Sequence, residues 1–149
     1  MKDVEGEALK ILNKQAGNIA FEYMKHSQHD ISGVAVGAAV VAGKELTNDI
    51  ILNVFGGCNI EFATSLVVHA ERVALVKAIS EGYTKIYSCH VTSLNEAQRA
   101  ALCGYCRQDF MYVNPEIMLF VYNPDHSEKL RVKLIDTMNY PYIGTGRIG

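Results

Sequence analysis

The segment from Gly33 to Leu46, GVAVGAAVVAGKEL, restricts the fold of this chain more than any other feature. Its small and β-branched residues form an apolar run of strand length, which is typical of a strand in a sheet covered on both faces. We expect this strand to end in a turn at Gly43 and to form a hairpin with a second strand near residues 50–55. A sheet covered on both faces requires helices on each side of it.

Two other segments have apolar residues at helical spacing. Roughly residues 5–26 predict an amphipathic first helix, and about residues 64–81 predict a largely buried second helix closed by Gly82 in a left-handed conformation. Strand patterns follow at 85–94, 117–123 and 129–135, and a polar loop and a short helix from Cys103 to Phe110 separate the first two.

Strands that alternate with helices after an opening hairpin predict an α/β fold, a three-layer α/β/α sandwich around a mixed sheet of about five strands. No repeat or linker divides the sequence, so we expect a single domain spanning residues 1–149. With 49% hydrophobic and 20% charged residues, a chain of this length can build a substantial core.

The charge and the N-terminal sequence exclude several classes of partner. A formal net charge of -2 and a pI near 6.2 give no long-range attraction to phosphate backbones, so we expect no nucleic-acid partner, which disfavours a polynucleotide editor. The N-terminus lacks the pattern of a signal peptide, and no apolar run is long enough to span a bilayer. We therefore expect a cytoplasmic protein with no membrane partner.

Cys103 and Cys106 form a CxxC pair at the expected start of the short helix. In a chain without an export signal, cysteines are better interpreted as thiols or metal ligands than as a disulfide framework. We expect the helix end to lower the pKa of both thiols. On spacing alone, a zinc site, a redox disulfide and two buried cysteines all remain open.

His69 and Glu71 lie at the front of the second helical pattern. Two helix starts can present His69, Cys103 and Cys106 to one ion, and three protein ligands leave a fourth position for water, as in a catalytic zinc site. Glu71 would then reach the metal-bound water and move its proton. A helix-capping histidine beside a dipole-favoured glutamate is the simpler interpretation, and it leaves a non-catalytic zinc-binding module as an alternative. The joint occurrence of HxE and CxxC matches the zinc deaminase signature.

Three motifs in order, GCNIEF (57–62), HAERVAL (69–75) and CGYCRQ (103–108), resemble those of the cytidine deaminase family, as do VGAA (36–39) and KAISEGY (77–83). The resemblance implies a cytidine deaminase-like fold and a hydrolase that converts cytidine or deoxycytidine to uridine or deoxyuridine plus ammonia. It implies one Zn²⁺ per subunit, held by His69, Cys103 and Cys106. Glu71 would carry protons from zinc-activated water to N3 of the base and to the leaving amine.

The resemblance also implies the partners and the substrate contacts. We expect a small-molecule cytosine nucleoside as substrate, a role in pyrimidine salvage, and a homo-oligomer, with a tetramer favoured over a dimer. Asn59 and Glu61 resemble the family pair that hydrogen-bonds the ribose 3′-hydroxyl. Backbone groups at Ala70, Ala101 and Cys103 would contact the base or the attacking oxygen.

The sequence departs from the family pattern at several positions. Val34 stands where the family usually has an aromatic residue that stacks on the base, and it can give apolar contact only. The blasticidin S deaminase branch also lacks that aromatic residue, so a deaminase of such an amino-pyrimidine nucleoside analogue is the main alternative. Leu102 replaces the proline that usually precedes the CxxC pair.

Arg72 resembles the small, tetrameric branch of the family, in which an arginine offsets the charge of a three-cysteine site. Two thiolates already neutralise Zn²⁺ here. We therefore expect Arg72 and Arg107 to leave the site more electropositive and to lower the pKa of the zinc-bound water.

Overall fold

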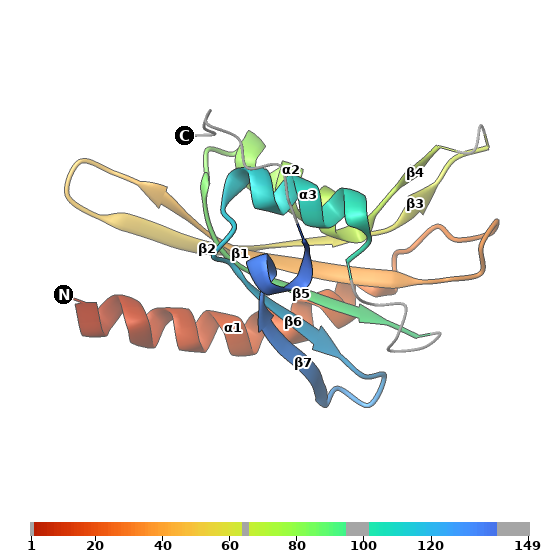
Figure 1. Ribbon diagram of the computed structural model, residues 1–149, viewed down its shortest axis with the longest axis horizontal. Coiled ribbons are helices and arrows are strands. Elements are labelled where there is room, and N and C mark those ends of the chain that lie inside the picture. The colour runs from red at the N-terminus through yellow and green to blue at the C-terminus, as the bar shows by residue number, and fades with distance from the viewer. Residues whose placement is uncertain (1, 64–65, 95–101, 140–149) are drawn as a thin grey trace.

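A five-stranded mixed sheet forms the centre of the computed structural model, which describes residues 2–63, 66–94 and 102–139 (Figure 1). The strand order is β2-β1-β5-β6-β7. β1 is antiparallel to both β2 and β5, β5 is parallel to β6, and β6 is antiparallel to β7. The strands are β1 (Val36–Glu45), β2 (Ile50–Cys58), β5 (Lys85–Ser93), β6 (Met118–Tyr122) and β7 (Glu128–Lys133).

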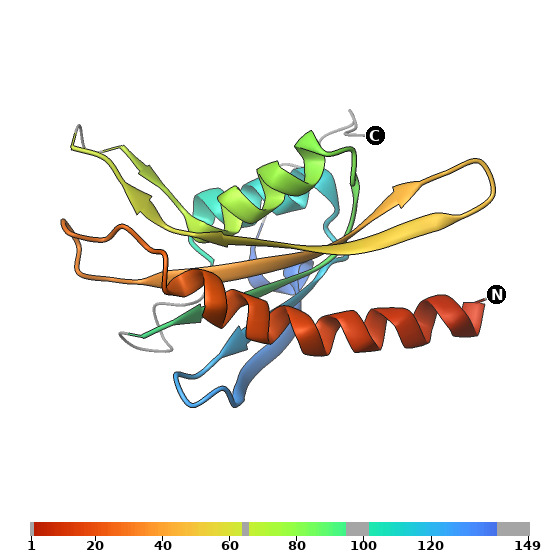
Figure 2. The same cartoon turned by 180° about the vertical axis from the view of Figure 1, so that it is seen from behind.

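Helices cover both faces of this sheet, which confirms the predicted three layers. α1 (Lys2–Met24) lies on one face, and α2 (Ala70–Ser80) and α3 (Gly104–Val113) lie together on the other (Figures 1 and 2). A short 3-10 helix, η1 (Leu134–Thr137), follows β7. Among the helices that the structure describes, none is long and apolar enough to cross a membrane.

β1 is buried on both faces because its small side chains alternate between two helical layers. Ala39 and Val41 pack with Ala16 and Ala20 of α1. The intervening residues of β1 face α2 in the larger core cluster, where Ala38, Val40 and Ala42 pack with Ala70, Ala74 and Ala78. The alternation follows from the two-residue period of a strand.

Two glycines let helix backbones come close to the sheet. A Cβ atom at Gly57 in β2 would lie 2.5 Å from the Ala70 carbonyl oxygen and 2.7 Å from the Ala74 nitrogen. A Cβ atom at Gly37 in β1 would lie 1.9 Å from the Ala20 carbonyl oxygen. The start of α2 therefore sits directly against the end of β2, and this contact fixes where residues 69–71 lie.

The strand prediction at Gly43 is wrong in one respect. β1 continues to Glu45, and the turn follows it, where the Leu46 amide donates to the Asp49 carbonyl at 2.8 Å. A Cβ atom at Gly43 would lie within 3.0 Å of the Ile50 and Tyr87 side chains. Glycine is needed here for close packing inside the hairpin, and the local turn signal is misleading.

The second helix begins later than predicted. Val67–Val68 (β4) pairs with Ile60–Glu61 (β3) as a two-stranded ribbon, and α2 starts only at Ala70. Apolar valines fit the helical and the strand period equally well, so the sequence pattern could not separate them. The other end agrees with the prediction, since Gly82 has φ of 85°.

Candidate active site

His69, Cys103 and Cys106 come together at the starts of α2 and α3. His69 is the N-cap of α2, Cys103 is the N-cap of α3, and Cys106 lies in the first turn of α3. The His69 Nδ1 atom is 3.2 Å from Cys103 Sγ and 3.3 Å from Cys106 Sγ. All three ligand atoms lie within 4.8 Å of one another, and within the described residues they form the one group of this kind.

These separations fit a tetrahedral zinc ion. Zinc bonds of about 2.3 Å to sulfur and about 2.0–2.1 Å to nitrogen place neighbouring ligand atoms roughly 3.5 Å apart. Two thiolates and an imidazole are donors that zinc prefers. His69 and Cys103 also line a cavity, so the ligand set is accessible to a further ligand from that cavity.

Burial changes the acid–base chemistry predicted for the cysteines. The pKa of Cys106 is raised, chiefly because its thiol is buried and also because Glu71 and Cys103 are close. The lowering of this pKa that the helix end was predicted to give is thus opposed at Cys106 by desolvation. A buried thiol of this kind becomes a thiolate when a cation compensates its charge, which zinc does.

Glu71 lies beside the ligands in the first turn of α2. Its side chain is 5% exposed, and its Oε2 atom is 3.8 Å from Cys106 Sγ. Burial raises the pKa of Glu71 to about 7. A carboxyl group with such a pKa can both take and give a proton near neutral pH.

One cavity of about 320 Å³ joins the metal ligands to the predicted substrate residues. Three of its residues, Ser32, Val36 and Val67, were not predicted. Val36 lies two residues after Val34 in the strand predicted from the sequence, so the period of two would have found it. The lining residues are Ser32, Val34, Val36, Asn59, Glu61, Val67, His69, Ala70, Glu71 and Cys103.

Asn59 binds the backbone that enters β1. Its Oδ1 atom accepts hydrogen bonds from the Val36 amide at 2.8 Å and from the Ser27 hydroxyl at 2.5 Å, and its Nδ2 group donates to the Val34 carbonyl at 2.7 Å. The side chain is buried. Asn59 therefore fixes Val34 and Val36 in the cavity wall.

Glu61 is bound by the loop before β1. Its carboxylate accepts from the Ile31 amide at 2.7 Å, from the Ser32 amide at 3.0 Å and from the Ser32 hydroxyl. These contacts, the Ser32 hydroxyl above all, lower the pKa of Glu61. The carboxylate is thus a fixed, charged acceptor at the cavity.

The comparisons with known proteins agree with this geometry. Residues 12–121 match the family described as the cytidine and deoxycytidylate deaminase zinc-binding region. The chain belongs to this family.

Solved structures of cytidine deaminases share the fold. The enzyme from Burkholderia pseudomallei is 26% identical with a TM-score of 0.72, over 87% of this chain and 98% of its own. The Mycobacterium tuberculosis enzyme is 20% identical with a TM-score of 0.65, over 87% and 95%. The Mycobacterium leprae enzyme is 20% identical with a TM-score of 0.63, over 84% and 95%.

As a member of this family, the protein is a zinc-dependent hydrolytic deaminase. That assignment sets aside the non-catalytic zinc module and the redox CxxC pair. Ala101, predicted to contact the base, lies outside the described residues. Leu102, in place of the family's proline, is 2% exposed and belongs to the main core cluster.

The two arginines have partners that the sequence does not predict, and their expected effect on the pKa of the zinc-bound water stays a prediction. Arg72 pairs with Asp109, with Nε and Oδ2 3.0 Å apart, so its charge is compensated by a carboxylate. Arg107 donates to the Thr137 carbonyl at 2.7 Å. An uncompensated positive charge at Arg72 is therefore not a feature of this deaminase.

Proposed function

We propose that this deaminase converts cytidine or deoxycytidine to uridine or deoxyuridine with release of ammonia. The observation that carries the proposal is that Asn59, Glu61 and Glu71 line one cavity with two of the metal ligands. A nucleoside has a base to be deaminated and a sugar to be held at a fixed distance from it. The cavity offers a group for each part.

Glu71 is proposed to move the protons of the reaction. Zinc, when bound, supplies a Lewis acid that makes water a nucleophile at neutral pH. Glu71 takes one proton of the attacking water and delivers it to N3 of the base. It then takes the remaining proton of that water, now on the oxygen bonded to C4, and delivers it to the amine, which leaves as ammonia. One carboxyl group can perform these transfers because its site is buried and adjacent to Cys106.

Glu61 is proposed to bind the 3′-hydroxyl of the sugar. A charged carboxylate can only accept hydrogen bonds, so it favours a hydroxyl donor. Asn59 shapes the same wall and would hold the sugar beside it. His69 with Ala70 and Cys103 would place the base, whose plane lies against the aliphatic side chain of Val34.

A panel of nucleosides tests this function by ammonia release. We expect cytidine and deoxycytidine to react with similar kcat/KM, and 2′,3′-dideoxycytidine to react about 10- to 100-fold more slowly, because Glu61 then loses its charged hydrogen bond. In Glu61→Gln, most of the difference in kcat/KM between deoxycytidine and 2′,3′-dideoxycytidine should be lost. A panel in which no cytosine nucleoside releases ammonia would remove the proposal.

Val34 favours one second candidate, an amino-pyrimidine nucleoside analogue of the blasticidin S type. An aliphatic wall gives no stacking that would select a planar base strongly. Including blasticidin S in the panel separates the two candidates. If its kcat/KM exceeds that of cytidine, the analogue is the substrate.

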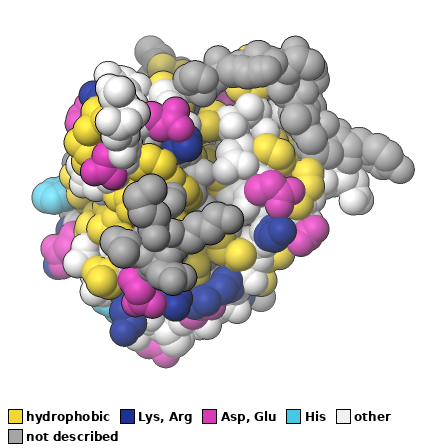
Figure 3. Space-filling model, turned by 90° about the vertical axis from the view of Figure 1, so that its left-hand side faces the viewer, with side chains coloured by type: hydrophobic (Ala, Val, Ile, Leu, Met, Phe, Trp, Pro, Cys, Tyr) yellow, Lys and Arg dark blue, Asp and Glu magenta, His cyan; other side chains and the backbone are white. Residues whose placement is uncertain are grey.

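We also propose a cytoplasmic homo-oligomer, with a tetramer favoured over a dimer. Several large apolar side chains are exposed on the segments next to the cavity: Ile31, Phe62, Leu66, Val67 and Tyr105. Burying them against another copy would be favourable. Figure 3 shows another face, where Lys and Arg side chains lie beside Asp and Glu around a hydrophobic area. Light scattering coupled to gel filtration would give the number of subunits.

A further inference from the structure

An ion pair joins the two helices that carry the metal ligands. Arg72 of α2 places Nε 3.0 Å from Oδ2 of Asp109 in α3, and its Nη2 group donates to Oδ1 at 3.4 Å. Two nitrogens thus lie within ion-pair distance of the two carboxylate oxygens, and the contact of Nη2 with Oδ1 has hydrogen-bond geometry.

The pair lies close to the ligands in both helices. Arg72 is about one helical turn beyond His69, and Asp109 is about one turn beyond Cys106. Any change in the separation of the two helices at this level therefore moves His69 relative to Cys106. Neither Arg72 nor Asp109 is among the residues that line the cavity with His69, Cys103 and Glu71, so the pair would act on the ligand atoms through the helices.

Side-chain packing between α2 and α3 is open at this level. A groove of about 340 Å³ runs between them, with Arg72 and Asp109 among its lining residues. Val76, which also lines the groove, is 56% exposed. Because this groove separates the side chains of α2 and α3, the ion pair is a direct link that can fix the distance between the two helices here. The remaining lining residues are Leu75, Ile79, Gln108, Tyr112 and Val113.

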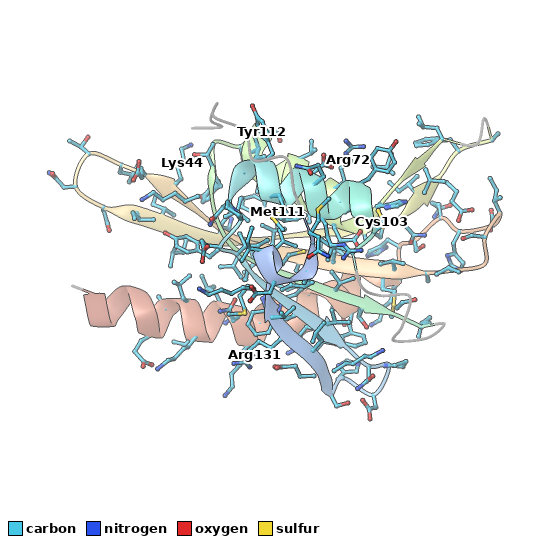
Figure 4. The ribbon with its side chains drawn as sticks, in the orientation of Figure 1. Lys44, Arg72, Cys103, Met111, Tyr112 and Arg131 are labelled. Carbon is cyan, nitrogen blue, oxygen red and sulfur yellow. The ribbon has the colours of Figure 1, made fainter. Side chains whose placement is uncertain are left out.

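The charges of the pair are matched to each other. Oδ2 of Asp109 is buried and has no hydrogen bond of regular geometry within the described residues, so the Arg72 contact compensates it. A site with two thiolates and one imidazole is already neutral with Zn²⁺. In Figure 4, Arg72 lies at the outer side of the helices, and Cys103 lies at the start of α3.

We propose that Arg72 and Asp109 are positioning residues that hold the start of α3 against the start of α2. The pair keeps Cys103 and Cys106 within bonding distance of the zinc ion that His69 also binds. Asp109 holds the Arg72 guanidinium against α3, and this contact links the two helices. Because the positive charge of Arg72 is compensated there, it does not weaken the binding of zinc by the two thiolates.

Zinc release from the loaded enzyme tests this role. Arg72→Gln and Asp109→Asn each remove one charge at nearly constant shape. We expect each variant to release zinc to a colorimetric chelator about 3- to 10-fold faster than wild type, because an exposed pair contributes modestly and ligand positioning contributes more. The double variant should be no faster than either single variant, because the two side chains act as one unit.

The exchanged pair, Arg72→Asp with Asp109→Arg, should restore the wild-type release rate to within roughly threefold, since it recreates the ion pair at low cost. If Arg72→Gln slows release while Asp109→Asn speeds it, Arg72 acts electrostatically on the thiolates and the clamp is wrong. Failure of the exchanged pair to restore the rate would also overturn the proposal.

A matched control separates this role from general stability. Lys85 and Glu45 form an ion pair between β5 and β1, which carry no ligand, with a separation of 2.5 Å. Glu45→Gln should leave zinc release unchanged. Thermal unfolding of the zinc-free proteins completes the design. If the pair has a purely structural role, Arg72→Gln should have a lower Tm than wild type but the same zinc release rate. That result would contradict the clamp.

Discussion

The Oε2 atom of Glu71 lies 3.8 Å from the Sγ atom of Cys106, although the two residues belong to different helices. The contact places a buried carboxyl group beside Cys106, one of the three residues positioned to hold zinc, as the proposed transfer of protons from a zinc-bound water requires. Neither helix could build this arrangement alone. Catalysis in this deaminase therefore depends on how α2 and α3 are placed on the sheet.

Glu71→Gln should abolish most activity and keep the metal. Glutamine has nearly the same shape but cannot take a proton, so kcat should fall by about 10²–10⁴. Ammonia release measures the rate, and metal analysis measures the zinc content, which should match wild type because Glu71 is not among the three ligands. Glu81→Gln, just beyond the other end of α2, should retain wild-type kcat. Substantial activity in Glu71→Gln would assign proton transfer to another group.

Cys106→Ser should lose zinc and activity together. Serine is a much poorer zinc ligand than a thiolate, and removing one of three protein ligands leaves too few to hold the ion. Cys58→Ser provides the control, because Cys58 is also buried but lies in β2, outside the ligand group. Zinc measured after dialysis should be close to wild type in Cys58→Ser and near zero in Cys106→Ser. Equal zinc in both variants would place the metal elsewhere.

Val34→Phe should strengthen binding of a cytosine nucleoside. Val34 lines the cavity, and an aromatic ring there could stack on the base, which is worth about 0.5–1.5 kcal/mol. KM for cytidine should therefore fall about 2- to 10-fold, with a smaller effect on kcat. Val34→Leu is the control for size, since it adds volume without a ring. A rise in KM for the phenylalanine variant alone would show that the base does not lie against this wall.

The sequence alone predicts the three layers of the fold, the hairpin of β1 and β2, and the three residues positioned to bind the metal. His69, Cys103 and Cys106 could be found because zinc requires particular donor types at helix starts. Ser32 and Val67 could not be found, since they reach the cavity through the loop before β1 and the short β4 strand, which have no strong periodic signal. The partner of Arg72 could not be found either, because Asp109 is brought near only by the packing of α2 beside α3.

Gly57→Ala should destabilise the fold and disturb the metal site. A Cβ atom at this position would lie 2.5 Å from the Ala70 carbonyl oxygen, so α2 must shift away from β2. We expect the free energy of unfolding to fall by about 1–3 kcal/mol, and zinc to be held less tightly. Gly6→Ala is the control with the opposite sign, because a Cβ atom there meets nothing within 4 Å and alanine favours a helix by up to about 1 kcal/mol. Urea unfolding of the zinc-free proteins measures the change in the free energy of unfolding for Gly57→Ala and for Gly6→Ala.

His90 should make stability depend on pH. Its ring is fully buried on the α1 side of β5, with Nδ1 2.8 Å from the Tyr122 hydroxyl and Nε2 3.1 Å from both Ser88 Oγ and Asn13 Oδ1. Burial, assisted by the charge of Arg131, lowers the pKa of His90 to about 3, whereas the unfolded chain has the ordinary value of about 6.5. Between these values the unfolded state binds a proton that the folded state does not.

The contribution of His90 to the free energy of unfolding should therefore decrease as the pH falls from about 6.5 toward 3, by at most about 1.4 kcal/mol per pH unit. Above pH 7, His90 should contribute no pH dependence, because both states are neutral there. His90→Gln removes the titrating group, so lowering the pH from 7 to 5 should decrease its urea midpoint less than that of wild type; the raised pKa of Glu71 acts in the opposite direction, and equally in both proteins. His26→Gln alters an exposed histidine and should keep the wild-type slope. Equal slopes in His90→Gln and wild type would mean that His90 is protonated in the folded protein, and that its hydrogen bonds with Asn13 and Tyr122 accommodate the charge.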